Sequence, residues 1–155
     1  MAMLEGIKIR RYEKNDSLAV LRLENECMKP EEVEIRAAQP KNPLKDIEGD
    51  FLANGEFLVA SKGGKIIAIG AMRRQGEAAE IAKIRVHPDF RRKSIGQEML
   101  LRLEKKAAEI GCKKIILDTA IGHLAAQKMY DKNGYKEYGR GESEGFYCIL
   151  YEKSI

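Results

Sequence analysis

The sequence predicts an α/β or α+β fold built on a mixed β-sheet. Two apolar patterns support this prediction: some runs alternate apolar and polar residues as strands do, and others repeat every three to four positions as helices do. The clearest helical run, residues 94–110, lies between two strand-like runs, and a helical crossover of this kind joins parallel strands. Two other strand-like runs are separated by Gly63 and Gly64, which is typical of an antiparallel hairpin.

The N-terminal half is expected to contain one strand, two helices and this hairpin. Ile7 and Ile9 alternate with charged residues in the first strand, and Asn15 or Asp16 can cap the helix that follows. The predicted elements are a strand at 7–12, a helix from Asn15 or Asp16 up to Pro30, an irregular stretch at 30–43, a short helix at 44–52, and hairpin strands at 57–61 and 65–73.

The C-terminal half alternates strands and helices before it ends in a pair of strands. Gly111 and Gly134 are natural stops for its two helices. Residues 138–146 contain three glycines and are expected to form a flexible loop that borders the substrate. The predicted elements are strands at 80–86, 114–119, 135–138 and 146–152, with helices at 94–110 and 123–133.

Length and composition favour one domain over residues 1–155. A chain of 155 residues buries roughly 70% of its unfolded surface, so it needs no disulfide or metal to fold. The 44% of hydrophobic and 34% of charged residues exclude a disordered tail and a collagen-like fibre. No apolar run reaches the roughly 18 residues of a membrane span. The first residues lack a signal-peptide pattern, so the cytoplasm is the expected compartment.

The cysteines and the net charge restrict the chemistry. Cys27, Cys112 and Cys148 lie far apart without CxxC spacing, so neither a disulfide framework nor a metal site is expected. No histidine stands close in sequence to Cys112 or Cys148, and core or incidental cysteines are favoured over a nucleophile. The formal net charge of +4 permits anionic ligands, but it lacks the large one-sided excess of a nucleic-acid binder.

A basic loop at the start of the 94–110 helix is the strongest chemical signal. The strand at 80–86 leads into a turn at Pro88 and then into Arg91, Arg92 and Lys93. A helix start offers unpaired N–H groups and a partial positive charge, so this corner is suited to bind phosphate. The alternative is a solvated basic turn. Neither a Walker motif nor GxGxxG is present, so ATP and NAD are not favoured.

The segment VHPDFRRKSIG, residues 86–96, resembles the acyl-CoA-binding motif of the GNAT N-acyltransferase superfamily. That motif is Gln or Arg, two residues, Gly, one residue, then Gly or Ala. Arg91, Ser94 and Gly96 occupy its three defining places. Ser94 departs from the usual glycine. Serine tolerates a positive φ poorly, whereas glycine adopts it readily.

A second block, AQKMYDKNGY at residues 126–135, is similar to the later motif of the same family. Ala126, Tyr130 and Gly134 recur there at the family's spacing, and His123 stands where the family often has Asn. The resemblance covers roughly residues 6–153 and is weakest over 30–55. It implies a central, mostly antiparallel twisted sheet of six to seven strands flanked by about four helices.

The resemblance further implies an acetyl-CoA site and no metal. The diphosphate would rest on the amides of 91–96, and the pantetheine would pair with the backbone of 84–86 as an added strand. His123, at the start of the 123–133 helix, would contact the cofactor as the family's Asn does, or would only begin the helix. The expected cofactor-binding residues are Ile84, Arg85, Val86, Arg91, Arg92, Lys93, Ser94, Ile95, Gly96, His123, Ala126 and Tyr130.

Glu80 is the candidate general base and Tyr130 the candidate general acid. Glu80 precedes Arg91 at the distance where some family members carry a catalytic glutamate. Simple alternation places Glu80 on the core-facing side with Ile84 and Val86, where a carboxylate takes up a proton more readily. A bulge, common in this strand of the family, would move it to the other face. The alternatives are a surface carboxylate for Glu80 and a packed aromatic for Tyr130.

The resemblance implies an amine acceptor, and among small amines, amino acids, antibiotics and protein amino groups we favour a primary amine of a small molecule. Because no cysteine nucleophile is expected, this amine should attack acetyl-CoA directly in a ternary complex. Its pocket is expected in residues 24–55 and the closing hairpin. Five glutamates between 24 and 34 would attract a cationic amine, or would be ordinary surface residues. The alternatives are a protein or peptide amino-group acetyltransferase and a non-catalytic CoA-binding sensor or interaction module. Neither nucleic acid nor a membrane is an expected partner, and a monomer or homodimer is expected.

Overall fold

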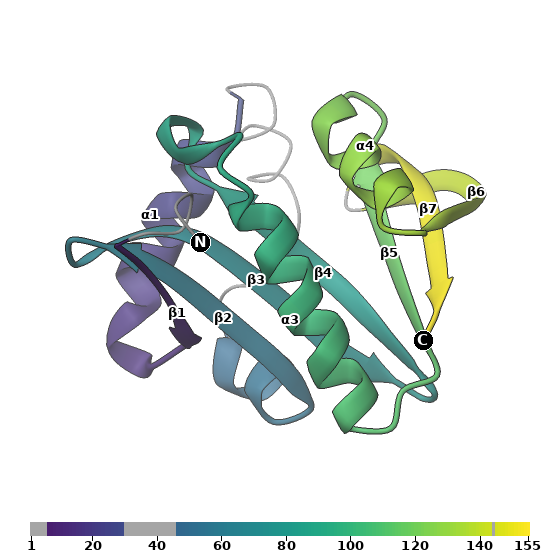
Figure 1. Cartoon of the computed structure of the whole chain (residues 1–155), viewed down its shortest axis with the longest axis horizontal. Helices are drawn as coiled ribbons and strands as arrows, with labels where there is room; N and C mark the ends of the chain where they lie inside the picture. The colour runs from purple at the N-terminus through teal and green to yellow at the C-terminus, as the bar shows by residue number, and fades with distance from the viewer. Residues whose placement is uncertain (1–5, 30–45, 144) are drawn as a thin grey trace.

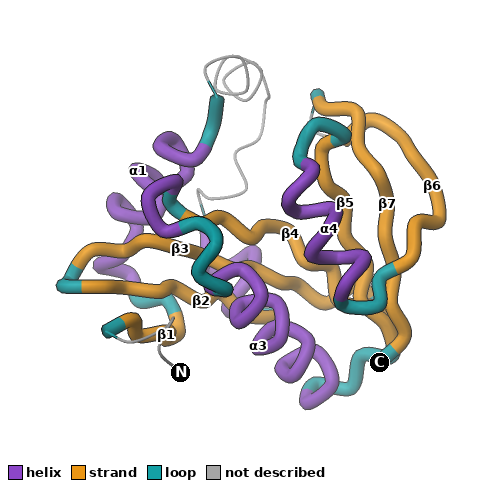
Figure 2. The backbone as a smooth tube through the Cα atoms, turned by 45° about the horizontal axis from the view of Figure 1, so that its top comes forward, coloured by secondary structure: helices purple, strands orange, loops and turns teal. Residues whose placement is uncertain are grey.

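The computed structural model describes residues 6–29, 46–143 and 145–155, which form a seven-stranded sheet with helices on both faces (Figures 1 and 2). The strand order is β1-β2-β3-β4-β5-β7-β6, and every neighbouring pair is antiparallel except β4 and β5. The predicted mixed, mostly antiparallel sheet is confirmed. The strands are β1 Ile7–Arg11, β2 Gly55–Lys62, β3 Lys65–Gln75, β4 Ala78–Val86, β5 Lys114–Ala120, β6 Lys136–Ser143 and β7 Phe146–Ser154.

Longer helices and short helical turns connect these strands in the predicted order. The predicted short helix at 44–52 is shorter in the structure, a single π-helical turn that begins at Glu48. Residues 44 and 45 and the irregular stretch predicted at 30–43 lie outside the described residues. The helices are α1 Ser17–Cys27, α3 Ile95–Glu109 and α4 Leu124–Lys132, with short turns η2 Lys14–Asp16, η3 Glu48–Leu52 and η4 Pro88–Phe90.

The sheet separates two apolar cores. On one face α3 packs through Met99 and Leu103, and neither side chain has exposed surface. On the other face α1 packs through Val20 and Leu23, beside η3. Because helices cover both faces of β3, residues 66–72 form a continuous apolar run rather than an alternating one.

The ends of the helices follow the sequence signals. Gly111 and Gly134 have φ of 89° and 88° and stop α3 and α4 in the left-handed conformation. Before α1, the Asp16 carboxylate accepts hydrogen bonds from the Arg10 guanidinium and from the Glu13 backbone N–H, each at 2.8 Å. The Arg10 guanidinium holds the pKa of the Asp16 carboxyl below its ordinary value. These bonds fix the start of α1 on β1.

The parallel pairing of β4 with β5 is short. It joins Ala78–Ile81 to Lys114–Leu117 and then ends. Both strands continue, and they diverge toward the top of Figure 1. Beyond Ile81, the β5-facing edge of β4 therefore has no partner among the described strands, and its backbone groups face the space between the two strands.

A β-bulge in β4 lies at the point of divergence. Ile81 pairs with Met72 and Lys83 pairs with Ala71, which leaves Ala82 without a partner residue on β3. A bulge adds one residue to one strand and so reverses which face the later side chains occupy.

The prediction that Glu80 shares a face with Ile84 and Val86 is wrong because of this bulge. Ile84 and Val86 pack against the α3 core. Glu80 pairs with Arg73, whose guanidinium lies over the Phe51 ring on the α1 face. The Arg73 Nε donates to the Glu80 carboxylate at 2.8 Å.

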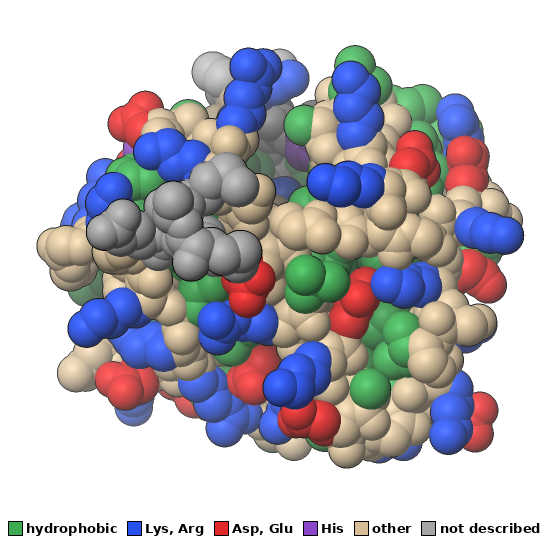
Figure 3. Space-filling model, in the orientation of Figure 1, with side chains coloured by type: hydrophobic (Ala, Val, Ile, Leu, Met, Phe, Trp, Pro, Cys, Tyr) green, Lys and Arg blue, Asp and Glu red, His purple; other side chains and the backbone are tan. Residues whose placement is uncertain are grey.

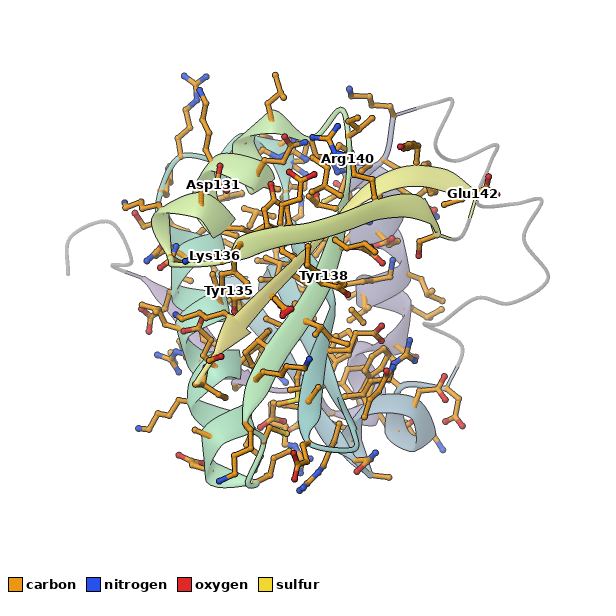
Figure 4. The ribbon with its side chains drawn as sticks, turned by 90° about the vertical axis from the view of Figure 1, so that its right-hand side faces the viewer. Asp131, Tyr135, Lys136, Tyr138, Arg140 and Glu142 are labelled. Carbon is orange, nitrogen blue, oxygen red and sulfur yellow. The ribbon has the colours of Figure 1, made fainter. Side chains whose placement is uncertain are left out.

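The prediction of a flexible loop at 138–146 is also wrong. Lys136–Ser143 forms β6, the outer strand beside β7, and Figure 4 shows Tyr138 on this strand. Gly139 and Gly141, which are typical of loops, lie inside an edge strand that tolerates them because it is hydrogen-bonded on one side.

A buried ion pair joins α1 to β4 beside the bulge. The Lys83 ammonium lies 2.9 Å from one oxygen of the Glu24 carboxylate, and Arg85 Nε lies 3.4 Å from the other oxygen. The side chains of Lys83 and Glu24 are only 3% and 8% exposed. Water screens this interaction little, and each charge depends on the other to offset its loss of hydration.

Removing the Glu24 carboxylate should therefore destabilise the fold strongly. We expect Glu24→Leu to lower the free energy of unfolding by about 3–5 kcal/mol, because the Lys83 ammonium stays buried next to Arg85 without that carboxylate. The double variant Glu24→Leu/Lys83→Met should lose clearly less free energy of unfolding than Glu24→Leu alone. Urea unfolding of both variants measures the difference, and equal losses would contradict an energetic coupling between the two side chains.

Candidate functional site

A cleft of about 730 Å³ opens where β4 and β5 diverge. Its floor is the unpaired edge of β4, its walls are the loop before α3 and the first turns of α4, and its far end reaches α1 and β7. Figure 3 shows Lys and Arg side chains on both sides of the hollow at the upper edge of the molecule. The cleft therefore contains the segments that the sequence predicted to bind acetyl-CoA.

The loop between η4 and α3 is held in an unusual backbone conformation. Arg92 and Ser94 both have φ of 63°, and they are the only non-glycine residues with positive φ in the described part of the chain. Left-handed conformations cost a non-glycine residue roughly 1–2 kcal/mol. Such strain concentrates at binding sites, where it turns backbone groups toward a ligand. The departure of Ser94 from glycine is therefore a real conformational cost.

The first turn of α3 forms a narrow waist in the cleft. A Cβ on Gly96 would lie 3.5 Å from Met129 Sδ and 3.8 Å from the side chains of Ile84 and Val86. These are ordinary van der Waals distances, so the first turn of α3 packs closely on β4 and α4 at this level. A linear chain that follows the edge of β4 would have its anionic end at the N–H groups that open α3.

The backbone carbonyl of Val86 is already hydrogen-bonded by side chains of the cleft. It accepts bonds from Arg91 Nε at 3.1 Å and from the Cys27 thiol at 3.4 Å. Burial raises the pKa of the Cys27 thiol, which keeps the proton that it donates. A protonated thiol is a weak nucleophile, so the structure does not favour Cys27 as the site of an acyl intermediate.

His87 ties the end of α1 to the turn before the basic loop. Its Nδ1 accepts a hydrogen bond from the Asp89 backbone N–H at 3.1 Å, so that Nε2 carries the proton and donates to Glu26 at 2.7 Å. Glu26 is thus engaged at this turn, and Glu24 is buried at Lys83. These two carboxylates do not form the acidic rim considered for residues 24–34; Glu31, Glu32 and Glu34 lie outside the described residues.

Tyr130 is the buried aromatic residue of the cleft. It comes from α4, is 6% exposed, and packs its ring against Tyr135 and Tyr151 at 5.6 and 5.8 Å. Burial raises the pKa of Tyr130 to about 12. The hydroxyl therefore keeps its proton at neutral pH and can donate a hydrogen bond into the cleft.

Most of the predicted site residues come together in this cleft. Lys93 is an exception, since its ammonium lies over the Phe90 ring at 5.5 Å and it is not among the described residues that line the cleft. Glu80 is another exception, because it is not among the described residues that line the cleft. The predicted residues that line the cleft are Ile84, Arg85, Val86, Arg91, Arg92, Ser94, Ile95, Gly96, His123, Ala126 and Tyr130.

Other residues line the cleft without having been predicted. Lys83 and Asp118 bring charges into it, and Cys27 and Cys148 bring thiols. Asp118 had a signal in the sequence, because it interrupts the apolar run of the predicted strand at 114–119. The cysteines had no such signal, since only the fold brings α1 and β7 to the same place.

The described residues contain neither a membrane-spanning helix nor a metal-binding group. No described helix is long and apolar enough to cross a membrane. Within 6–29, 46–143 and 145–155, no group of three or more His, Cys, Asp or Glu side chains is arranged to hold a metal ion.

Known proteins share both the sequence pattern and the fold. The sequence profile of the acetyltransferase (GNAT) family matches residues 18–135. An acetyltransferase of Pectobacterium atrosepticum is 32% identical over 132 residues, which are 84% of this chain and 88% of that protein. The PaiA N-acetyltransferase of Thermoplasma acidophilum, crystallised with coenzyme A, has a TM-score of 0.77 and 21% identity over 96% of this chain and 99% of its own.

A second solved structure has the same architecture. The ribosomal-protein-S18-alanine N-acetyltransferase of Escherichia coli superposes with a TM-score of 0.76 at 19% identity, over 96% of this chain and 94% of its own. At such identities the two structures establish the shared fold.

Replacing Ser94 with glycine should stabilise the protein. At φ of 63° glycine avoids the steric cost of a Cβ, so we expect Ser94→Gly to raise the free energy of unfolding by about 1 kcal/mol. Ser17→Gly is the matched control, because Ser17 has φ of −54° and the same exchange should lower stability by roughly 0.5–1 kcal/mol. Thermal unfolding measures both, and a loss of stability in Ser94→Gly would contradict the strain.

Proposed function

Because the chain belongs to the GNAT family of acetyltransferases, we propose that it transfers the acetyl group of acetyl-CoA to a primary amine of a small molecule. The acyl donor follows from the family, whose members depend on acyl-CoA and act on amines. The observation that carries the proposal is the course of the cleft, which leads from the basic loop along the edge of β4 to the buried Tyr130.

The described residues suit each part of acetyl-CoA. The N–H groups at 94–96 and the side chains of Arg91 and Arg92 offer positive charge to the diphosphate. The edge of β4 at 84–86 has no partner strand and offers backbone groups to the amides of the pantetheine arm, although the Val86 carbonyl already accepts bonds from Arg91 and Cys27. Acetyl-CoA supplies an activated acyl group, and the protein contributes position and proton transfer.

The inner part of the cleft supports a small acceptor. Met28 of the α1 end and Phe146 and Cys148 of β7 line it. Concave sites lined largely by apolar side chains are typical of small ligands. An amine with a pKa near 10.4 must lose a proton before it attacks, which costs roughly 4–5 kcal/mol at neutral pH. The site therefore needs a group that takes this proton, and Glu80 is the candidate predicted from the sequence.

Tyr130 is proposed to protonate the sulfur as it leaves. Its pKa of about 12 lies above that of a thiol, near 8.5, so full transfer to a thiolate would be uphill by about 5 kcal/mol. The donation must therefore be coupled to a second proton, which the nitrogen loses as the amide forms. The raised pKa ensures that the hydroxyl carries its proton at the start of each turnover.

A thiol-release screen tests the function itself. The purified protein is mixed with acetyl-CoA and a panel of small amines, amino acids and peptides, and free thiol is measured over time. We expect release with small amines. Release with peptides alone would assign the enzyme to protein amino groups and contradict a small acceptor. Binding of acetyl-CoA without release across the panel would contradict catalysis and favour a sensor or interaction module.

Tyr130→Phe tests the proton donor. We expect kcat to fall about 10- to 10³-fold with little change in the affinity for acetyl-CoA, because the lost hydroxyl acts on the leaving sulfur. Tyr151→Phe is the control: Tyr151 belongs to the same aromatic cluster, but it is not among the described residues that line the cleft. An unchanged kcat in Tyr130→Phe would remove this residue from the mechanism.

A further inference from the structure

We propose that Asp118 is the carboxylate that binds the ammonium group of the acceptor beside the thioester and takes its first proton. This inference rests on the proposed N-acetyltransferase function and names a residue that the sequence did not single out. Among the described residues that line the cleft, Asp118 is the only carboxylate. Glu80, the base predicted from the sequence, is bonded to Arg73 and does not line the described cleft.

Asp118 occupies the apex of the opening between β4 and β5. The last parallel pair joins Ile81 to Leu117, so Asp118 is the first residue of β5 beyond the shared hydrogen bonds. Across the opening lies the bulge at Ala82, which also lines the cleft. The reactive end of a chain laid along β4 would stop here, because the two strands close the space below.

The side chain of Asp118 lies on the opposite face of the sheet from Tyr130. Leu117 and Thr119 are buried, Leu117 in the α3 core that also contains Tyr130. Strand alternation therefore turns the exposed Asp118 toward the α1 face. A thioester placed in the opening would have the carboxylate on one side and the phenol on the other. An amine can then approach from one side while the sulfur departs on the other.

The charges around Asp118 agree with this position. Its negative charge is among the causes that raise the pKa of Tyr130, after burial, so the two groups interact across the opening. Burial, followed by the carboxylates of Glu152, Asp118 and Glu80, raises the pKa of Tyr138 on the outer strand. The charged and titratable groups of the described residues around this region are Lys29 after α1, Lys83, Arg85 and Glu80 of β4, His123 and Tyr130 at α4, Tyr138 of β6, and Cys148 and Glu152 of β7.

Atoms and charges balance in the step that follows. An ammonium proton passes to the Asp118 carboxylate and from there to solvent. The neutral nitrogen then forms a bond to the thioester carbonyl carbon, and the carbon–sulfur bond breaks with its electron pair on sulfur. Tyr130 gives its proton to sulfur and recovers one from water, while the second proton of the nitrogen passes to Asp118 and on to solvent. The products are an amide, the free thiol of coenzyme A and one proton released to water.

Steady-state kinetics of Asp118→Asn test the assignment. With the best small amine from the screen, we expect kcat/KM for the amine to fall about 10- to 10²-fold, the KM for acetyl-CoA to stay constant, and the acidic limb of the pH profile to move to higher pH, because only the neutral amine can then react. Glu152→Gln is the matched control, since it removes a carboxylate from the same face without touching the described lining. It should leave all three quantities unchanged.

Two kinetic outcomes would overturn the assignment: wild-type amine kinetics and pH profile in Asp118→Asn, or the same shift of the acidic limb in Glu80→Gln instead. If the wild type itself released no thiol, the proposed function would fall separately. Calorimetric titration of each small amine of the panel into the complex with coenzyme A would then decide about Asp118. Weaker amine binding in Asp118→Asn would support it, and equal binding would refute it.

Discussion

The early end of hydrogen bonding between β4 and β5 is the constraint on which the rest of the structure depends. Parallel strands normally continue to pair, but here pairing stops after Ile81 and Leu117. Along one edge of β4, backbone groups are left without a partner strand, which lowers the stability of the fold. Helices on both sides keep the opening from closing: α1 is tied to β4 through Glu24 and Lys83, and α4 packs its aromatic cluster on the opposite side.

The loop before α3 shows a second departure from the most stable arrangement. Arg92 and Ser94, two left-handed residues separated by Lys93, store strain close to the N–H groups that would receive a diphosphate. The surrounding structure over-determines this conformation, since His87 fixes the preceding turn and Ile95 is buried at the start of α3. The strained loop thus lowers the stability of the free protein, and an anion bound there would raise it again.

Much of the fold could be predicted from the sequence, because the signals are local. Periodicity placed the long helix and the central strands, and Gly111 and Gly134 marked two helix ends. The bulge at Ala82 left no trace in the residue pattern, and it reversed the face assigned to Glu80. β6 was missed because glycines inside an edge strand resemble a loop.

The site was predictable where a contiguous motif carries it and not where the fold assembles it. The loop at 91–96 and the α4 residues could be found because their motifs resemble those of the GNAT family, and all of the predicted ones except Lys93 line one cleft. Asp118, Lys83 and Cys27 reach the same space from three elements that are far apart in sequence. A single charge in an apolar strand is a weak signal alone, and its meaning depends on where the neighbouring strand stops pairing.

The double engagement of the Val86 carbonyl has a consequence for how tightly a co-substrate is held. This oxygen is satisfied in the free protein by Arg91 and Cys27. A pantetheine amide that bound there would exchange one partner for another, and the net gain would be the small difference between two bonds rather than a whole one. The displaced guanidinium would then become available to the diphosphate. Occupancy of the strand edge and of the phosphate loop would thus be thermodynamically linked through one side chain.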